Sequence, residues 1–240
     1  MKASVVPDTA PALAWLKRKA TKQSLDGMAR YAIPSDRAFG VSMKDVQALA
    51  KELGRDHALA QALWDTRWYE AQLLAAYVDD PAQVTVAQMN RWCRAFDNWA
   101  VCDTLCYALF DRTPHAWARA EAWASSREEY VKRAGFAMLW SLSVHDKGAP
   151  DARFIAGLAW IAEGAVDERH YVKKAVNMAL RAVGKRNAAL HASAIATATR
   201  LAASSDDTAR WVGRDALSEL RSASVLRRVS KKAQSARPKT

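Results

Sequence analysis

Apolar residues recur at intervals of three and four along almost the whole chain, and this period constrains the fold more than any other feature. Strand-like alternation is almost absent, and only 9 of the 240 residues are Gly. The pattern predicts an all-α protein of about twelve helices. We expect them at residues 9–20, 22–33, 42–54, 57–65, 68–79, 85–96, 99–111, 114–125, 127–144, 151–164, 168–186 and 188–203, with a last one at 206–222.

The breaks between these helices carry residues that end or begin helices. Proline lacks a backbone N–H and is tolerated at a helix start, while Asp, Ser and Thr side chains accept hydrogen bonds from the first turn. Prolines stand at 81, 114 and 150, candidate N-caps are Asp56 and Asp206, and Thr85 with Gln88 and Ser125 with Glu128 have capping-box spacing.

Connections of only a few residues favour antiparallel packing of neighbouring helices. A series of such hairpins, in units of roughly 40 residues, predicts a curved solenoid with a concave face. A compact helical bundle is the alternative. We expect one domain over residues 1–222 and a disordered basic tail over residues 223–240, because the last 17 residues carry six Lys or Arg and no acid.

Residues 169–187 form the most strongly basic segment, with six Lys or Arg and no Asp or Glu. On a helix, Val172, Val176, Ala179 and Val183 form one apolar stripe, and the opposite side carries Lys174, Met178, Arg181 and Lys185. Lys173 and Arg186 add charge beside that side. Ordinary exposed faces mix signs, so this pattern favours binding to an array of phosphates over a merely solvated surface.

The segment FDNWAVCDTLCY, residues 96–107, is the second informative stretch. On a helix that starts near Trp99, the side chains of Trp99, Asp103, Cys106 and Tyr107 lie within a narrow arc, away from Val101, Leu105 and Leu109. An indole could press on a sugar or base, and a carboxylate could stabilise positive charge there. The alternative is a half-buried Trp beside a surface Asp.

Three further positions are candidates for contact with DNA. Arg133 is expected off the packing side of its helix, where it could hold a phosphate or pair with Glu129. Tyr31 ends a helix, where a core role is the alternative. Arg214 adds a basic group to the last expected helix.

Several function classes lack their signatures in this sequence. Cys93, Cys102 and Cys106 are expected to be buried reduced thiols, because no His lies near enough in sequence to complete a metal site. No nucleotide-binding Gly motif, HExxH or nucleophile elbow is present, so we expect no metal and no cofactor. No apolar window is long enough for a membrane span, and we expect a cytoplasmic, nucleoid-associated monomer.

The segments MARY, FDNWAVCD, KRAGFAML and KKAVNMALRAVGKRN together resemble the bacterial AlkD-type DNA alkylation repair proteins, in the right order over roughly residues 20–222. The resemblance implies a HEAT-like repeat fold. It also implies a glycosylase that excises cationic N3- and N7-alkylated purines from double-stranded DNA without metal, cofactor or base flipping.

Carried over by motif, the resemblance assigns catalysis to Trp99 and Asp103, and DNA contact to Arg133 and Tyr31. Asp103 would stabilise an oxocarbenium-like sugar, and Trp99 would contact the deoxyribose. The chain departs from the family at Met178, where a second Trp is usual, and at Ser141, where some members have Lys. A non-catalytic DNA-binding relative that recognises duplex or branched DNA is the alternative function, and a protein-interaction scaffold is a third.

Overall fold

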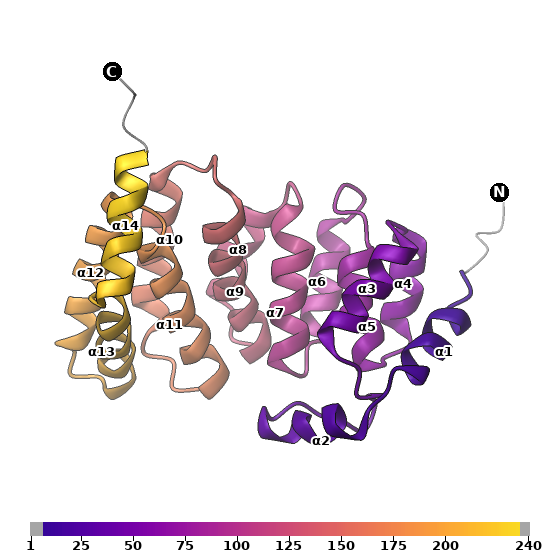
Figure 1. The fold of residues 1–240 in the computed structure, drawn as a ribbon. Coiled ribbons are helices and arrows are strands. Elements are labelled where there is room, and N and C mark those ends of the chain that lie inside the picture. Colours follow the sequence, from indigo (N-terminus) through magenta and orange to yellow (C-terminus); the bar gives the residue numbers. More distant parts are fainter. Residues whose placement is uncertain (1–6, 236–240) are drawn as a thin grey trace. The chain divides into compact units, whose positions relative to one another are not determined.

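The structure is a computed structural model of the chain, and it describes residues 7–235. Over this range the chain is helical and contains no strand, which confirms the all-α prediction (Figure 1). The chain divides into two compact units, Met1–His115 and Ala116–Thr240, and we describe each by itself as unit 1 and unit 2.

Unit 1 is built around a helix that is buried on nearly every side. This helix, α5, is almost entirely apolar, with Leu73, Leu74 and Val78 removed from solvent, and it packs against α3, α4 and α7. The helices of the unit are α1 (Ala10–Arg18), α2 (Lys22–Arg30), α3 (Met43–Leu53), α4 (His57–Asp65), α5 (Tyr69–Val78), α6 (Val86–Arg94), α7 (Trp99–Ala108) and the short 3₁₀ helix η1 (Phe110–Arg112).

Large aromatic side chains fill the core between α4 and α6. Trp64 and Trp92 stack with ring centroids 4.4 Å apart, and Phe96 meets Trp64 edge-on. Such pairs add to the stability that burial alone provides. Trp64 and Trp92 are therefore core residues that pack neighbouring helices together.

Unit 2 contains α8 (Ala116–Ala124), α9 (Glu129–His145), α10 (Asp151–Gly164), α11 (His170–Gly184), α12 (Ala188–Ala202), α13 (Asp207–Leu220) and α14 (Ala223–Ser235). The helices α9 and α11 pack against each other (Figure 1). Two glycines allow other pairs to approach closely. A Cβ on Gly135 would lie 2.3 Å from the backbone nitrogen of Ala124, and one on Gly213 would lie 2.3 Å from that of Ala202.

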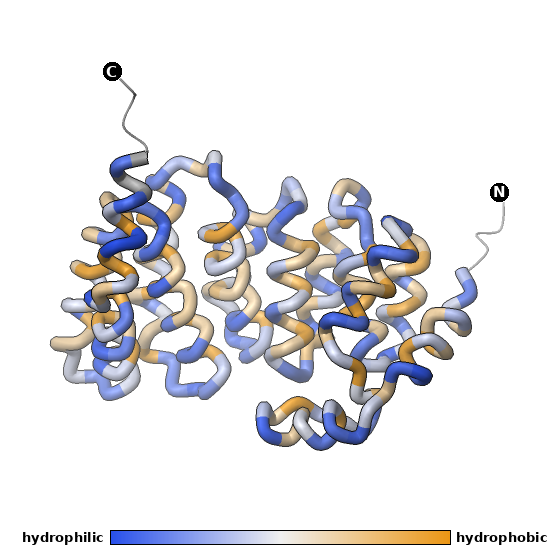
Figure 2. The backbone as a smooth tube through the Cα atoms, viewed as in Figure 1, coloured by the Kyte–Doolittle hydropathy of each residue, from blue (hydrophilic) through white to orange (hydrophobic). Residues whose placement is uncertain are grey.

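Most expected helices agree with the structure to within a few residues at each end. Hydrophobic and hydrophilic residues recur in turn along the packed helices, as expected when one side of each helix faces the core and the other faces water (Figure 2). Asp56 and Asp206 cap α4 and α13 as predicted, each accepting a hydrogen bond from a first-turn N–H. Thr85 likewise accepts from the backbone of Gln88.

Three predictions about the elements are wrong. Ser125 does not cap α9, since Glu128 occupies the N-cap position and the Ser125 hydroxyl donates to the Ala122 carbonyl. The helix expected at 99–111 ends at Ala108 and gives way to η1. Residues 223–235 form α14 rather than a disordered tail, because Val225 and Val229 bury an apolar side. Residues 236–240 of the expected tail lie outside the described range.

Candidate nucleic-acid interface

In unit 1, Trp99 and Asp103 lie one turn apart on α7. The Asn98 side chain begins this helix by accepting a hydrogen bond from the Val101 N–H at 2.9 Å. Trp99, Asp103 and Tyr107 are all partly exposed, while the residues between them are mostly buried. An indole, a carboxylate and a phenol therefore follow one another along the accessible side of α7, as the helical spacing predicted.

The Trp99 indole is fixed by a contact with the N-terminal part of the chain. Its Nε1 donates to the backbone carbonyl of Tyr31 at 2.7 Å, which ties α7 to the end of α2. Tyr31 itself is 64% exposed, so the alternative of a core tyrosine is wrong. The next residue, Ala32, has a φ of 50°, in the left-handed region. The bond sets where the indole lies and leaves the Tyr31 ring accessible.

The three cysteines are not part of this accessible stripe. Cys93, Cys102 and Cys106 are free and buried, as expected. The expectation that Cys106 shares the arc of Trp99 is wrong, because its side chain is fully buried. Burial and the neighbouring Cys102 raise the pKa of the Cys106 thiol well above its usual range, so it stays protonated and unreactive at neutral pH.

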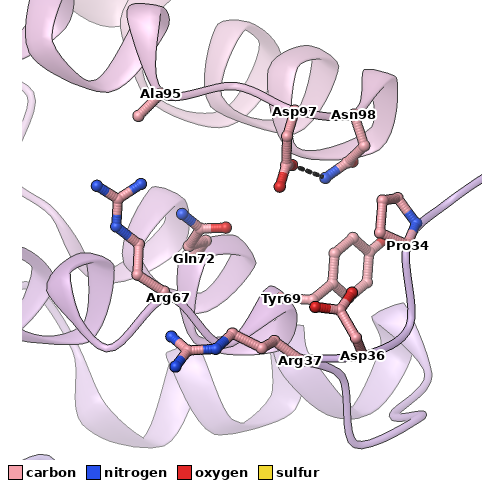
Figure 3. Close-up of a pocket in the computed structure, with 9 residues that line it drawn as sticks. All are labelled: Pro34, Asp36, Arg37, Arg67, Tyr69, Gln72, Ala95, Asp97 and Asn98. Carbon is pink, nitrogen blue, oxygen red and sulfur yellow. Dashed lines mark hydrogen bonds between the residues drawn. The ribbon is translucent and has the colours of Figure 1, made fainter.

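A small polar pocket adjoins the start of α7. Its volume is about 100 Å³, and it is lined by residues from the α2–α3 connection, from the α4–α5 connection and the start of α5, and from the α6–α7 connection (Figure 3). The lining residues are Pro34, Asp36, Arg37, Arg67, Tyr69, Gln72, Ala95, Asp97 and Asn98. Burial, followed by the adjacent Glu70 carboxylate, raises the pKa of Tyr69 to about 12, so its hydroxyl is neutral. Sequence spacing gave no signal for this pocket.

In unit 2, α11 has the two sides that its sequence predicts. Val172, Val176, Ala179 and Val183 are fully buried. On the other side Lys174 is exposed, and Lys173 and Met178 are partly exposed.

A ring from α13 lies beside these lysines. The ammonium groups of Lys173 and Lys174 are 5.5 Å and 4.9 Å from the ring centroid of Trp211. Such cation–π contacts hold a cation against an aromatic face. Trp211 is partly exposed, at the basic side of α11. Sequence reasoning missed this aromatic, which lies on the helix two elements farther along the chain.

The C-terminal half of the basic side is neutralised by an acid from α13. Glu219 accepts from Arg181 at 2.5 Å and from Lys185 at 2.6 Å. Partial burial would raise the pKa of Glu219, but the hydrogen bonds and charges of Lys185 and Arg181 hold it below its usual value. The segment 169–187 itself contains no acid, but the folded surface around α11 does, because Glu219 of α13 lies beside Arg181 and Lys185. The expectation of a basic face without acids is therefore wrong for the folded protein.

Arg186 has a structural role in this unit. Its Nη2 donates to the carbonyls of Asp146, Lys147 and Ala149 after the end of α9, at 2.6 to 3.2 Å. Its guanidinium also lies 4.2 Å from the Phe154 ring centroid. Burial lowers the pKa of Arg186. Most of its donors are therefore committed to the protein, whereas Arg214 on α13 is exposed.

Arg133 is a buried arginine that joins two helices. It is 5% exposed, and its Nη1 donates to the Tyr171 carbonyl at 2.8 Å, which joins α9 to the first turn of α11. The prediction that Arg133 lies off the packing side is wrong, because the two helices close around it. Nearby, Lys132 and Arg169 both pair with Asp167, at 2.9 and 2.6 Å.

Unit 2 contains a pocket lined by cations, one of which comes from α14. The sequence analysis did not predict α14 and so missed this pocket. Its volume is about 240 Å³, and its cations are Lys147, Lys185, Arg186 and Arg228, beside the Trp140 ring. No acid lines it.

Residues 7–235 contain no cluster of three or more His, Cys, Asp or Glu side chains that could hold a metal ion. None of the helices in this range is long and apolar enough to span a membrane.

Comparisons with known proteins place this geometry in a family. No curated protein sequence matches the chain. One solved structure, described as representing "a new family of proteins related to the HEAT-like repeat DNA glycosylases with affinity for branched DNA structures", is 20% identical and aligns with a TM-score of 0.73 over 80% of this chain and 83% of its own. This likeness shows the HEAT-like helical-repeat fold. A model of the family described as "DNA alkylation repair enzyme" matches residues 12–220, and the chain therefore belongs to the DNA alkylation repair enzyme family.

Proposed function

We propose that this protein is a DNA glycosylase that removes cationic N3- and N7-alkylated purines from double-stranded DNA. The observation that carries the proposal is the partly exposed Trp99 and Asp103 pair on α7, in a member of a DNA alkylation repair family. DNA phosphates repel a carboxylate, so a surface built only to bind DNA has no use for one beside an indole. A carboxylate is useful where positive charge develops.

The chemistry requires little more than that charge stabilisation. An alkylated purine already carries a positive charge and leaves as a neutral base when the C1′–N bond breaks with its electron pair. The deoxyribose then carries the positive charge, which the Asp103 carboxylate stabilises. Water adds to C1′ and loses a proton to the carboxylate or to solvent. Trp99, held by its hydrogen bond to Tyr31, packs against the sugar.

Binding to the DNA backbone is assigned chiefly to the accessible cations of unit 2. Lys174 and Arg214 are exposed, Met178 is partly exposed, and Lys173 is partly exposed beside Trp211. Arg181 and Lys185 contribute less, because Glu219 offsets their charge. Arg133 and Arg186 act indirectly, by fixing α11 and the end of α9.

Base release provides the test. The wild-type protein is incubated with methylated duplex DNA, and 7-methylguanine and 3-methyladenine are separated and quantified. We expect release by the wild type and a loss of about 100-fold or more in Asp103→Asn, since removing one group that stabilises transition-state charge has an effect of this order. A glycosylase of known activity is the positive control. No release by the wild type under conditions where that control works would overturn the proposal.

A second candidate function is binding to branched DNA without excision. Two observations favour it: the similar solved structure represents proteins with affinity for branched DNA, and Met178 replaces the aromatic ring usual in the family. Equilibrium binding to a four-way junction and to a duplex of the same length separates the candidates. Tighter binding to the junction together with no base release supports the second function.

A further inference from the structure

We propose that Arg37 and Arg67 form a binding site for one phosphate group beside Trp99. The proposal deepens the proposed function and rests on it in one respect, which is that the phosphate belongs to a DNA strand. The site lies within unit 1, in the small pocket at the start of α7 (Figure 3). Four observations support it.

The backbone of Arg67 is strained. Arg67 follows the C-cap of α4, its N–H donates to the Trp64 carbonyl at 3.2 Å, and its φ is 60°. Glycine is the residue most common at this position, since a Cβ is unfavourable in the left-handed region. Non-glycine residues that retain such strain cluster at functional sites. An arginine here sacrifices stability and places a guanidinium at the pocket.

Arg37 lies on a loop that is held at several points. Its carbonyl accepts from the Tyr69 N–H at 2.8 Å. The buried Glu70 carboxylate accepts from the N–H groups of Phe39 and Gly40 at 2.9 and 2.7 Å. The Phe39 ring also stacks on Trp68, with centroids 4.3 Å apart. A loop fixed in this way loses little entropy when its side chain binds a ligand.

Both guanidinium groups are available to an anion. Neither Arg37 nor Arg67 forms an ion pair or a side-chain hydrogen bond with any residue of the described range 7–235. In Figure 3 the two groups lie at the same end of the pocket, and Asp36 lies toward Pro34 at the other. Two guanidiniums can offer paired N–H donors to phosphate oxygens, a geometry that Lys does not provide.

The pocket also adjoins the proposed catalytic pair. Asn98 lines it and directly precedes Trp99, whose indole is bonded to the Tyr31 carbonyl. The only non-glycine residues with positive φ in the described chain, Ala32 and Arg67, both belong to segments that form this region. A strand whose sugar contacts Trp99 would place a neighbouring phosphate within reach of the two arginines.

Arg67→Gly tests the site, because it removes the guanidinium and relieves the strain together. We expect a melting temperature equal to or higher than that of the wild type, with duplex affinity lowered about 10-fold at physiological salt. The slope of log affinity against log salt should fall by about 1. Lys51→Ala, at an exposed position on α3 that does not line the pocket, is the matched control: it also removes one positive charge, and its affinity should stay close to that of the wild type. Arg37→Ala should resemble Arg67→Gly in affinity.

The outcomes separate this site from the proposed function. Weaker binding by Arg67→Gly and Arg37→Ala supports the site even if no base is released from methylated DNA. Unchanged affinity and salt slope in both variants overturn the site even if base release is normal. Competition by inorganic phosphate at concentrations too low to change the ionic strength would instead identify a free anion as the ligand and overturn the assignment to DNA.

Discussion

The helices α7 of unit 1 and α11 of unit 2 present opposite chemistry on their accessible sides. The sequence of α7, WAVCDTLCYA, contains one acid and no Lys or Arg, whereas α11 contains Lys173, Lys174 and Arg181 and no acid. Both helices bury an apolar side, so packing does not account for the contrast. The proposed function assigns the two helices a division of labour, with sugar chemistry on α7 and backbone binding on α11.

The two units also hold their candidate groups in place by different means. In unit 1 a buried acid, Glu70, binds backbone N–H groups of the loop that carries Arg37. In unit 2 the buried Arg133 and the partly exposed Arg186 bind backbone carbonyls at helix ends. Substitution of an accessible charged residue is therefore expected to change DNA affinity. Substitution of Glu70, Arg133 or Arg186, which bind backbone groups of the protein, is expected to lower the free energy of unfolding.

The largest effect on stability is expected from Arg186→Ala. The change leaves the carbonyls after α9 without their donor and removes the contact with Phe154. We expect a loss of about 2 to 3 kcal/mol in the free energy of unfolding, measured by urea denaturation. Arg227→Ala, an exposed position on α14, should change it by less than about 0.5 kcal/mol. Equal stability of Arg186→Ala and wild type would show that Arg186 belongs with the binding cations.

Charge reversal at Lys174 should weaken DNA binding by about 10-fold, irrespective of sequence or methylation. The affinity can be measured by fluorescence anisotropy at several salt concentrations. Lys51→Glu, an exposed position on α3 of unit 1, changes the net charge equally and should have a much smaller effect. If the two variants lose affinity equally, net charge rather than the surface of α11 determines binding.

Replacing Met178 with Trp should restore the aromatic that the family usually has. An indole face attracts a cationic base, and an exposed cation–π contact of 0.5–1 kcal/mol corresponds to about a 3-fold gain in affinity for methylated over unmethylated duplex DNA. Met178→Leu keeps an apolar side chain without a ring and should show no gain. A 3-fold gain in Met178→Leu would mean that apolar contact alone is limiting.

The smallest effect is expected for the thermal stability of Asp167→Asn, which alters the acid paired with Lys132 and Arg169 before the start of α11. Hydrogen bonds from Arg169, and then from Lys132, lower the pKa of Asp167 well below its usual value, although burial opposes them. A lowered folded-state pKa contributes stability that is present above the ordinary value of about 4 and is lost as the pH falls below it. Asp167→Asn should therefore melt a few degrees below wild type at pH 7, and the difference should shrink below pH 4. A constant difference would exclude ionisation as its source.

Local patterns in the sequence predict much of this fold, and contacts between distant segments explain what they miss. The period of the apolar residues predicts the buried side of α11, and Asp56 and Asp206 predict two helix starts. Helix α14 was missed because the six cations of residues 224–240 suggested disorder, although Val225 and Val229 form an apolar side.

The candidate site likewise has one part that local sequence patterns predict and one part that they do not. The spacing of Trp99 and Asp103 predicts one accessible stripe. No local pattern encodes the rest. Arg181 pairs with Glu219 and Arg133 is covered by α11, and in each case the partner lies more than 30 positions away in the sequence. The pocket at Arg67 depends on the left-handed backbone conformation of that residue and on distant segments.

The most direct test of the division of labour is to measure excision rate and DNA affinity on the same methylated duplex for wild type and Asp103→Asn. With DNA in saturating excess, the single-turnover rate of 7-methylguanine release should fall about 100-fold or more. The dissociation constant should stay equal or decrease, because a negative charge near phosphates has been removed. An unchanged rate, or a loss of rate explained entirely by weaker binding, would contradict the assignment of chemistry to α7.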